Sequence, residues 1–121
     1  MADLAGRIML THRLAPEHLM AAIALTREQA VTLIAEGRLS MQLDAVQQQR
    51  LRLFVNILQR LEWRLNHDSG AIRHALDLPL AVLDNKAPAQ LFCGSIDDLR
   101  AVRLSIDSVE APKVKWYRIG H

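Results

Sequence analysis

Residues 76–106 read LDLPLAVLDNKAPAQLFCGSIDDLRAVRLSI, and this stretch contains a closely spaced series of helix stops and starts. Pro79 ends the apolar run before it, because a proline pushes the preceding residue out of the helical region. Asp84 and Asn85 predict a turn, since both residue types hydrogen-bond to nearby backbone and tolerate the left-handed conformation. We therefore expect short helical pieces separated by turns.

A second set of signals follows this turn. The pair Ala87-Pro88 predicts a helix start with proline at the first position, where its missing N–H costs nothing. Gly94 fits the left-handed position just past a short helix. Ser95 is expected to cap the next helix, with Asp98 three residues later near the exposed N–H groups and the positive end of the helix dipole.

The order of these residues resembles the C-terminal toxin-binding domain of the Xre/MbcA/ParS antitoxins. The shared pattern is a leucine-aspartate turn, a small residue before proline, two hydrophobic residues, a glycine and an amphipathic helix. The matching residues are Leu83, Asp84, Ala87, Pro88, Leu91, Phe92, Gly94, Leu99, Val102 and Ile106. The chain departs from the family at Asn85, where glycine is usual, and at Ala87, where a threonine N-cap typically contributes about 1 kcal/mol.

The resemblance implies an antitoxin of a bacterial type II toxin–antitoxin system, which binds a partner toxin and occludes its active site. The implied toxin is of the RES type, which consumes NAD. Most apolar members of the implied toxin-binding set are also expected to serve the core. The set consists of Leu83, Pro88, Leu91, Phe92, Leu99, Val102, Trp116, Tyr117 and Arg118.

Residues 113–121, KVKWYRIGH, interleave basic and aromatic side chains. This pattern is typical of surfaces that stack on nucleic-acid bases. It is also typical of anchors for a protein groove, because Trp, Tyr and Arg dominate interface hot spots. A third interpretation is an edge strand packed on the chain's own core. By analogy with the resembled family, we favour a toxin groove over nucleic acid.

The N-terminal part predicts two short helices, at 16–24 and 27–36, with the size of a helix-turn-helix. Thr26 and Gln29 form a capping box, and Gly37 suits the position after the second helix. The order resembles the Xre-type half of the same family, which implies operator DNA as a partner and a transcriptional regulator as the alternative function. The candidate DNA contacts are Arg27, Gln29, Thr32 and Arg38. A plain packed pair of helices explains the same pattern, and residues 1–14 are expected to be irregular or a partly ordered arm.

Asp44, with Gln47 at the box position, predicts the start of a long helix that reaches about Asn66. Its apolar residues at spacings of three and four form a seam: Leu51, Phe54, Leu58, Leu61 and Leu65. Further apolar residues lie off this seam, namely Leu53, Val55, Ile57 and Trp63. The helix should therefore be contacted on more than one side, either as the central strut of the core or partly as a homodimer seam.

The polar residues 67–70, HDSG, mark the clearest boundary, and Ser69 is expected to cap the helix that follows. We therefore expect an all-α chain in three parts. These parts are a helix-turn-helix-like segment at 1–43, a long central helix at 44–67, and a toxin-binding-like part with a basic and aromatic tail at 68–121.

The charge is nearly balanced, since 15 basic and 13 acidic residues give a net +2 over 121 residues. Residues 1–67 hold eight basic and six acidic side chains, and residues 68–121 hold seven of each. Neither part has the basic excess that drives nucleic-acid binding by electrostatics alone. Half of the residues are hydrophobic, so the chain can bury a core.

Other patterns predict an intracellular binding protein and no enzyme. Cys93 is the only cysteine, which favours a reducing cytoplasm, and its apolar neighbours predict a buried thiol. No cleavage site marks a signal peptide, and no apolar run reaches the roughly 20 residues that span a membrane. The five histidines have no metal-ligand spacing, and no phosphate loop or nucleophile elbow is present. We expect no cofactor, no metal and no small-molecule substrate.

Overall fold

The computed structural model describes residues 1–109, and the predicted all-α fold is confirmed over them. Short 3-10 turns connect the helices of the C-terminal half, and a single antiparallel bridge joins Leu80 to Lys86. The elements are α1 (Ala2–His12), α2 (Pro16–Ile23), α3 (Arg27–Glu36), α4 (Ala45–Arg64), α5 (Ser69–Leu76), η1 (Ala81–Leu83), η2 (Pro88–Leu91), α6 (Ile96–Ser105) and η3 (Ile106–Ser108).

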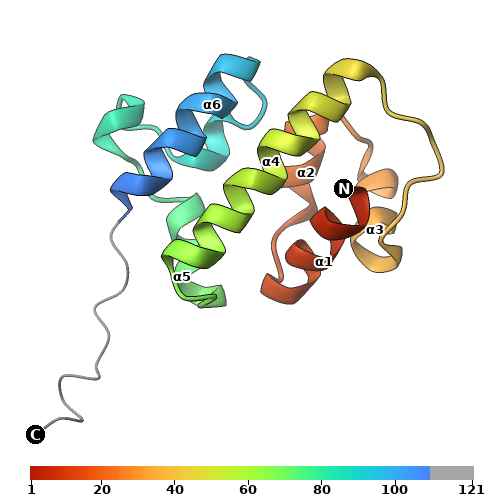
Figure 1. Cartoon of the computed structure of the whole chain (residues 1–121), viewed down its shortest axis with the longest axis horizontal. Helices are drawn as coiled ribbons and strands as arrows, with labels where there is room; N and C mark the ends of the chain where they lie inside the picture. Colours follow the sequence, from red (N-terminus) through yellow and green to blue (C-terminus); the bar gives the residue numbers. More distant parts are fainter. Residues whose placement is uncertain (110–121) are drawn as a thin grey trace, which may run out of the picture.

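Helix α4 crosses the middle of the molecule (Figure 1). Helices α1, α2 and α3 lie on one side of it, and α5, α6 and the 3-10 turns lie on the other. The seam residues from Leu51 to Leu65 are all buried, as are Leu53, Val55 and Ile57, which lie off the seam. The prediction that α4 is contacted on more than one side is therefore confirmed. Trp63 is the exception, because 81% of its surface is exposed.

The expectation of an irregular arm at residues 1–14 was wrong, because residues 2–12 form α1. Ala5, Ile8 and Met9 are buried on one face of this helix at spacings of three and four. Gly6 interrupts that pattern in the sequence, yet it is what lets α1 pack closely. A Cβ at Gly6 would collide with the carbonyl oxygen of Leu33 on α3. Gly6 thus weakens the sequence pattern that predicts a helix, but its lack of a side chain lets α1 pack against α3.

Three predicted helix starts are confirmed as capping boxes. In a capping box the side chain of the first residue accepts from the backbone N–H three residues later, and the side chain of that later residue accepts from the backbone N–H of the first. Thr26 pairs with Gln29, Asp44 with Gln47, and Ser95 with Asp98. Gly37 takes the expected left-handed conformation after α3, with a φ of 72°. Asp84 and Asn85 also take left-handed conformations, which confirms the predicted turn.

Two local predictions were wrong. Asp68, one residue earlier than predicted, caps α5 by accepting a hydrogen bond from the Ala71 N–H at 3.0 Å. Gly94 has no positive φ, although a left-handed conformation was expected. Its lack of a side chain serves a different purpose, since a Cβ at Gly94 would collide with the Asp98 carboxylate of the capping box.

Arg50 on α4 connects the two halves of the molecule. Its Nε donates to the carbonyl oxygen of Ala22, near the end of α2, at 2.5 Å. Its Nη2 and Nη1 donate to the carbonyl oxygens of Phe92 and Gly94 at 2.6 and 2.7 Å. The last carbonyls of a helix have no partner within that helix, and a cation near them is favourable. One guanidinium therefore both caps α2 and holds the turn before α6.

No helix within residues 1–109 is long and apolar enough to cross a membrane.

We predict that Arg50→Met lowers the free energy of unfolding by about 3 kcal/mol, because hydrogen bonds to a charged donor contribute about 1.5–3 kcal/mol each and the carbonyls would lose this donor. Urea unfolding followed by circular dichroism measures the change. Arg52→Met on the exposed side of the same helix is the matched control and should stay within about 0.5 kcal/mol of the wild type. Equal midpoints for the two variants would contradict the role of Arg50.

Candidate functional site

The predicted toxin-binding residues that the structure describes lie mainly in the core. Leu83, Pro88, Phe92, Leu99 and Val102 are buried, and Leu91 is half-buried. Their side chains pack beneath the protein surface and are not part of it. Trp116, Tyr117 and Arg118 lie outside the described residues. A docking surface on the described part must therefore use other side chains.

Phe92 lies at the centre of this support. Its ring packs edge-to-face against the ring of Phe54 on α4, with ring centroids 5.3 Å apart and ring planes at 85° to each other. It makes a similar contact with His18 on α2, at 5.6 Å and 83°. Edge-to-face pairs of this kind add about 0.5–1.5 kcal/mol to the burial of the rings. Phe92 thus joins the same two helices that Arg50 joins through its backbone contacts.

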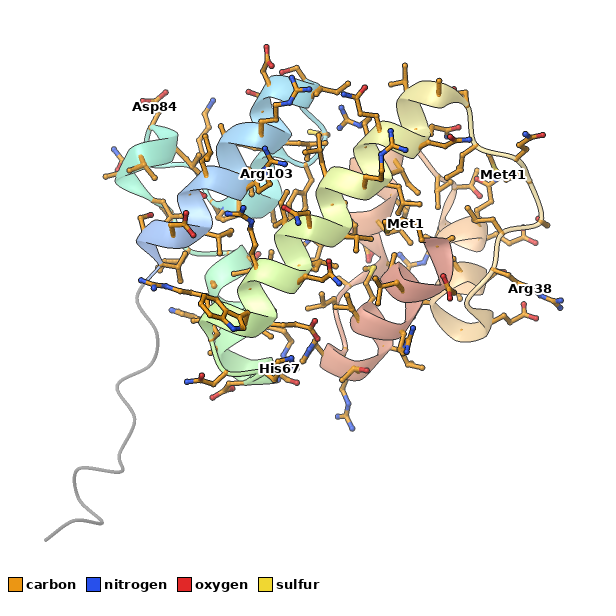
Figure 2. The ribbon with its side chains drawn as sticks, viewed as in Figure 1. Met1, Arg38, Met41, His67, Asp84 and Arg103 are labelled. Carbon is orange, nitrogen blue, oxygen red and sulfur yellow. The ribbon has the colours of Figure 1, made fainter. Side chains whose placement is uncertain are left out.

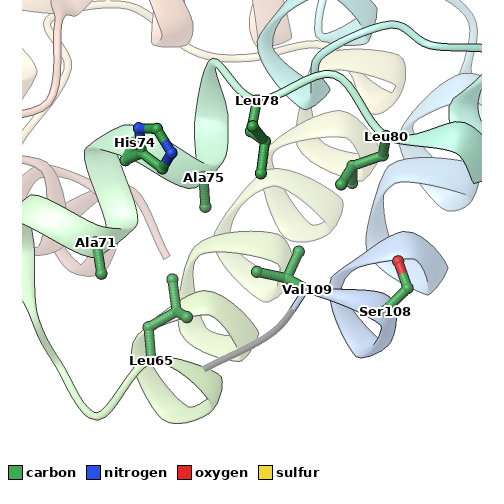
Figure 3. A pocket seen from close by; sticks show the side chains of 8 residues that line it. All are labelled: Leu65, Ala71, His74, Ala75, Leu78, Leu80, Ser108 and Val109. Atoms are coloured by element: carbon green, nitrogen blue, oxygen red, sulfur yellow. The ribbon is translucent and has the colours of Figure 1, made fainter. Parts of the chain in front are cut away.

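An apolar cavity of about 600 Å³ opens between α5 and the end of the described chain (Figure 3). Its walls come from α4, α5, the segment after α5, and the last two described residues. The lining residues are Leu65, Ala71, His74, Ala75, Leu78, Leu80, Ser108 and Val109. Figure 3 shows Leu78, Leu80 and Val109 pointing into the hollow. The cavity therefore lies at the C-terminal end of the described residues.

A second, shallower hollow of about 310 Å³ lies beside it and is also lined mainly by apolar groups: Val82, Ala101, Leu104, Ser105 and Ser108. Val82 and Leu104 are 64% and 65% exposed. Ser108 lines both hollows, so the two adjoin at this residue. We call this region the Ser108 surface and define it by Leu78, Leu80, Val82, Leu104, Ser108 and Val109.

The candidate DNA-contacting residues lie on and just after α3, and several already have partners within the chain. Arg27 Nη1 donates to Glu17 at 2.8 Å, and this hydrogen bond lowers the pKa of Glu17. Gln29 accepts from the Thr26 N–H and donates to the sulfur of Met41. Arg38 lies 3.4 Å from Glu36, and Thr32 is half-buried. DNA binding by these residues stays a prediction.

A polar network links α1, α4 and α5, and sequence reasoning missed it. The ring nitrogens of His12 lie 2.7 Å from the Ser69 hydroxyl and 2.7 Å from a Glu62 carboxylate oxygen. The His12 carbonyl accepts a hydrogen bond from Arg73. A hydroxyl, an imidazole and a carboxylate in this order are typical of nucleophilic catalysis. Here His12 is only 1% exposed, which leaves its ring little access to a substrate. The network instead holds the three helices together.

The prediction of a buried thiol was wrong, because Cys93 is exposed. The side chain points outward from the turn after η2, and its sulfur lies 3.8 Å from the carbonyl oxygen of Gln90. Its apolar neighbours in the sequence were misleading, since Phe92 alone fills the core at this turn. Within residues 1–109 there is no group of three or more His, Cys, Asp or Glu side chains placed to hold a metal ion.

Comparisons of the chain with protein-family models, with curated proteins and with solved structures found no match.

His18 gives the stability of the fold a pH dependence. Burial lowers the pKa of His18 below its usual value of 6.5, and the nearby carboxylates of Asp77 and Glu17 oppose that shift. The folded state therefore prefers the neutral ring, while the unfolded state binds the proton more readily. The stability contribution is present above pH 6.5 and is lost as the pH falls from there through the lowered folded pKa.

We predict that the free energy of unfolding decreases between about pH 7 and pH 5, and that His18→Gln makes this decrease shallower. Urea titrations at several pH values measure the slope. Gln59→Ala, at an exposed position without an ionisable group, is the control and should leave the slope unchanged. An unchanged slope in His18→Gln would show that another group causes the pH dependence.

Proposed function

We propose that this protein is an antitoxin that binds a partner toxin through the Ser108 surface and adjoining residues. The single observation that carries the proposal is the meeting of two apolar hollows at Ser108, near the C-terminal end of the described residues. Exposed apolar side chains grouped in this way mark interaction sites more often than isolated ones do. The resemblance of residues 83–106 to antitoxin toxin-binding domains supports the same conclusion.

The surface offers the partner two ready anchors. Full burial of one exposed Val or Leu side chain contributes about 1.5–3 kcal/mol, so Val82 and Leu104 together can provide much of an interface's apolar energy. Leu78 and Leu80 border the larger cavity, which can receive an apolar or aromatic side chain from the partner. The buried residues Leu99 and Val102 hold α6 in position beneath these contacts.

The proposed mechanism is stoichiometric. The Ser108 surface fixes the toxin next to the C-terminal segment, whose Trp116, Tyr117 and Arg118 then reach into its active-site cleft. Two aromatic rings and a guanidinium suit this role, because such side chains carry most of the binding energy in protein interfaces. The resemblance suggests a toxin of the RES type that consumes NAD.

The double variant Val82→Asp/Leu104→Asp should abolish rescue of growth when the protein is co-expressed with a RES-type toxin encoded beside its gene. Two carboxylates in an apolar interface lose the burial energy and add a desolvation cost. Co-purification and growth curves measure the loss, and the melting temperature should change little because both side chains are exposed.

Leu10→Asp/Val46→Asp is the matched control, since Leu10 and Val46 are 59% and 57% exposed but lie on α1 and at the start of α4. This control should rescue growth as the wild type does. Full rescue by Val82→Asp/Leu104→Asp would contradict the assignment of the surface. Failure of the wild-type protein to bind or neutralise such a toxin would contradict the proposed function itself.

Deletion of residues 113–121 should leave the helicity and the melting temperature unchanged and should abolish rescue from the toxin. The deletion removes the proposed blocking side chains but leaves the Ser108 surface, so weakened binding to the toxin should remain measurable by calorimetry. Early melting of the truncated protein would instead identify the tail as part of the core.

A further inference from the structure

A second recess, separate from the Ser108 surface, lies between α4 and α6 and is strongly basic. It encloses about 470 Å³ and is lined by Gln49, Arg52, Leu53, Asn56, Arg100 and Arg103. The four residues from α4 follow spacings of three and four and therefore share one face of that helix. Arg100 and Arg103 share a face of α6 in the same way. Figure 2 shows Arg103 on the side of α6 that faces α4.

This α4–α6 groove brings three guanidinium groups together without a carboxylate among its lining residues. The Nε of Arg103 is buried and forms no hydrogen bond with any group of residues 1–109. A buried donor without an acceptor is unfavourable, and a ligand oxygen that accepts from it would remove that cost. Arg52 has no ion pair with any residue of the described chain. The groove therefore concentrates positive charge that the fold itself does not neutralise.

The acidic side chains nearest to these arginines in the sequence do not fill the groove. Asp97 lies 3.2 Å from Arg100, but its side chain is 90% exposed, and an exposed pair of this kind contributes little. Asp98 is committed to the capping box with Ser95. Asp107 faces Arg60, outside the groove, at 3.8 Å. Arg100 can therefore turn from Asp97 to an incoming anion at small cost.

We propose that the α4–α6 groove binds the diphosphate group of a nucleotide-sized ligand. Guanidinium groups match phosphate oxygens with two parallel hydrogen bonds each, and three arginines balance the charge of about −3 on a nucleoside diphosphate. The amides of Gln49 and Asn56 add donors and acceptors that suit a ribose or a base. The volume falls within the range of about 300–1,000 Å³ that is usual for small-molecule sites.

The charge distribution favours a small ligand over a long polyanion. Nucleic-acid binding needs many cations spread along a surface, because each neutralised phosphate adds to the affinity. Here the chain's net charge is only +2. The candidate DNA-contacting cations Arg27 and Arg38 already face carboxylates, whereas Arg52 and Arg103 do not. The groove thus gathers three arginines at one place, two of which pair with no carboxylate of the described residues.

Isothermal titration of the full chain with inorganic pyrophosphate, ADP and inorganic phosphate tests the proposal. We expect saturable binding of pyrophosphate and ADP below about 1 mM, with phosphate weaker because it fills half of the groove. Tighter binding of ADP than of pyrophosphate would show that Gln49 and Asn56 contact the nucleoside. Equal affinities would limit the site to the diphosphate, and absence of saturable binding would overturn the proposal.

Arg103→Gln should weaken ADP binding about tenfold or more, because it removes a charged donor from the groove. Arg103→Lys should recover part of the affinity, since it restores the charge but not the paired geometry. The control is Arg7→Gln, an exposed arginine on α1, which should bind as the wild type does. Circular dichroism confirms the fold of each variant, and Arg52→Gln provides a second test at an exposed position.

Unchanged ADP affinity in both Arg103→Gln and Arg52→Gln would place the ligand elsewhere and overturn the proposal. Tighter binding of a short DNA duplex than of ADP, lost in the same two variants, would also overturn it in favour of a nucleic-acid surface. Val82→Asp/Leu104→Asp should retain ADP binding, so this test stands or fails independently of the proposed toxin contact.

Discussion

The arrangement of the molecule depends on the side chain of Arg50, which places one positive charge among three carbonyl dipoles. Within residues 1–109 the guanidinium pairs with no carboxylate, and it donates instead to the backbone at the end of α2 and at the turn from Phe92 to Gly94. Because this turn leads directly into Ser95 and the capping box, Arg50 also sets where α6 begins. The basic groove and the Ser108 surface both include α6 side chains. Their positions therefore depend on the contacts of Arg50.

Sequence reasoning succeeded where a feature is local. The capping boxes at Thr26, Asp44 and Ser95 could be predicted because their partners lie three residues apart and satisfy each other. The long α4 helix could be predicted from its uninterrupted apolar spacing. Helix α1 could not, because Gly6 and Arg7 obscure the face formed by Ala5, Ile8 and Met9. The benefit of Gly6 appears only against Leu33, a residue far along the chain.

The candidate sites were harder to predict, because they depend on distant residues and on exposure. Residue type does not distinguish Val102, which is fully buried, from Val82, which is largely exposed, although both valines lie within residues 76–106. Arg52 and Arg103 form one groove only after α4 and α6 pack together. His12, Glu62 and Ser69 likewise meet across 50 or more residues of sequence. No spacing rule could have joined these groups.

The order of the elements has a consequence for synthesis of the chain on the ribosome. Helix α3 contacts α1 and α2, and both α1 and α2 contact α4, so these first elements can assemble as soon as α4 has emerged. Phe92 and Gly94 follow Arg50 by 42 and 44 residues in the sequence. Arg50 can therefore form these two hydrogen bonds only after both residues have been synthesised. Until then the side of α4 that packs against α6 has no cover. We therefore expect this apolar face of α4 to stay exposed on the nascent chain until α6 has been synthesised.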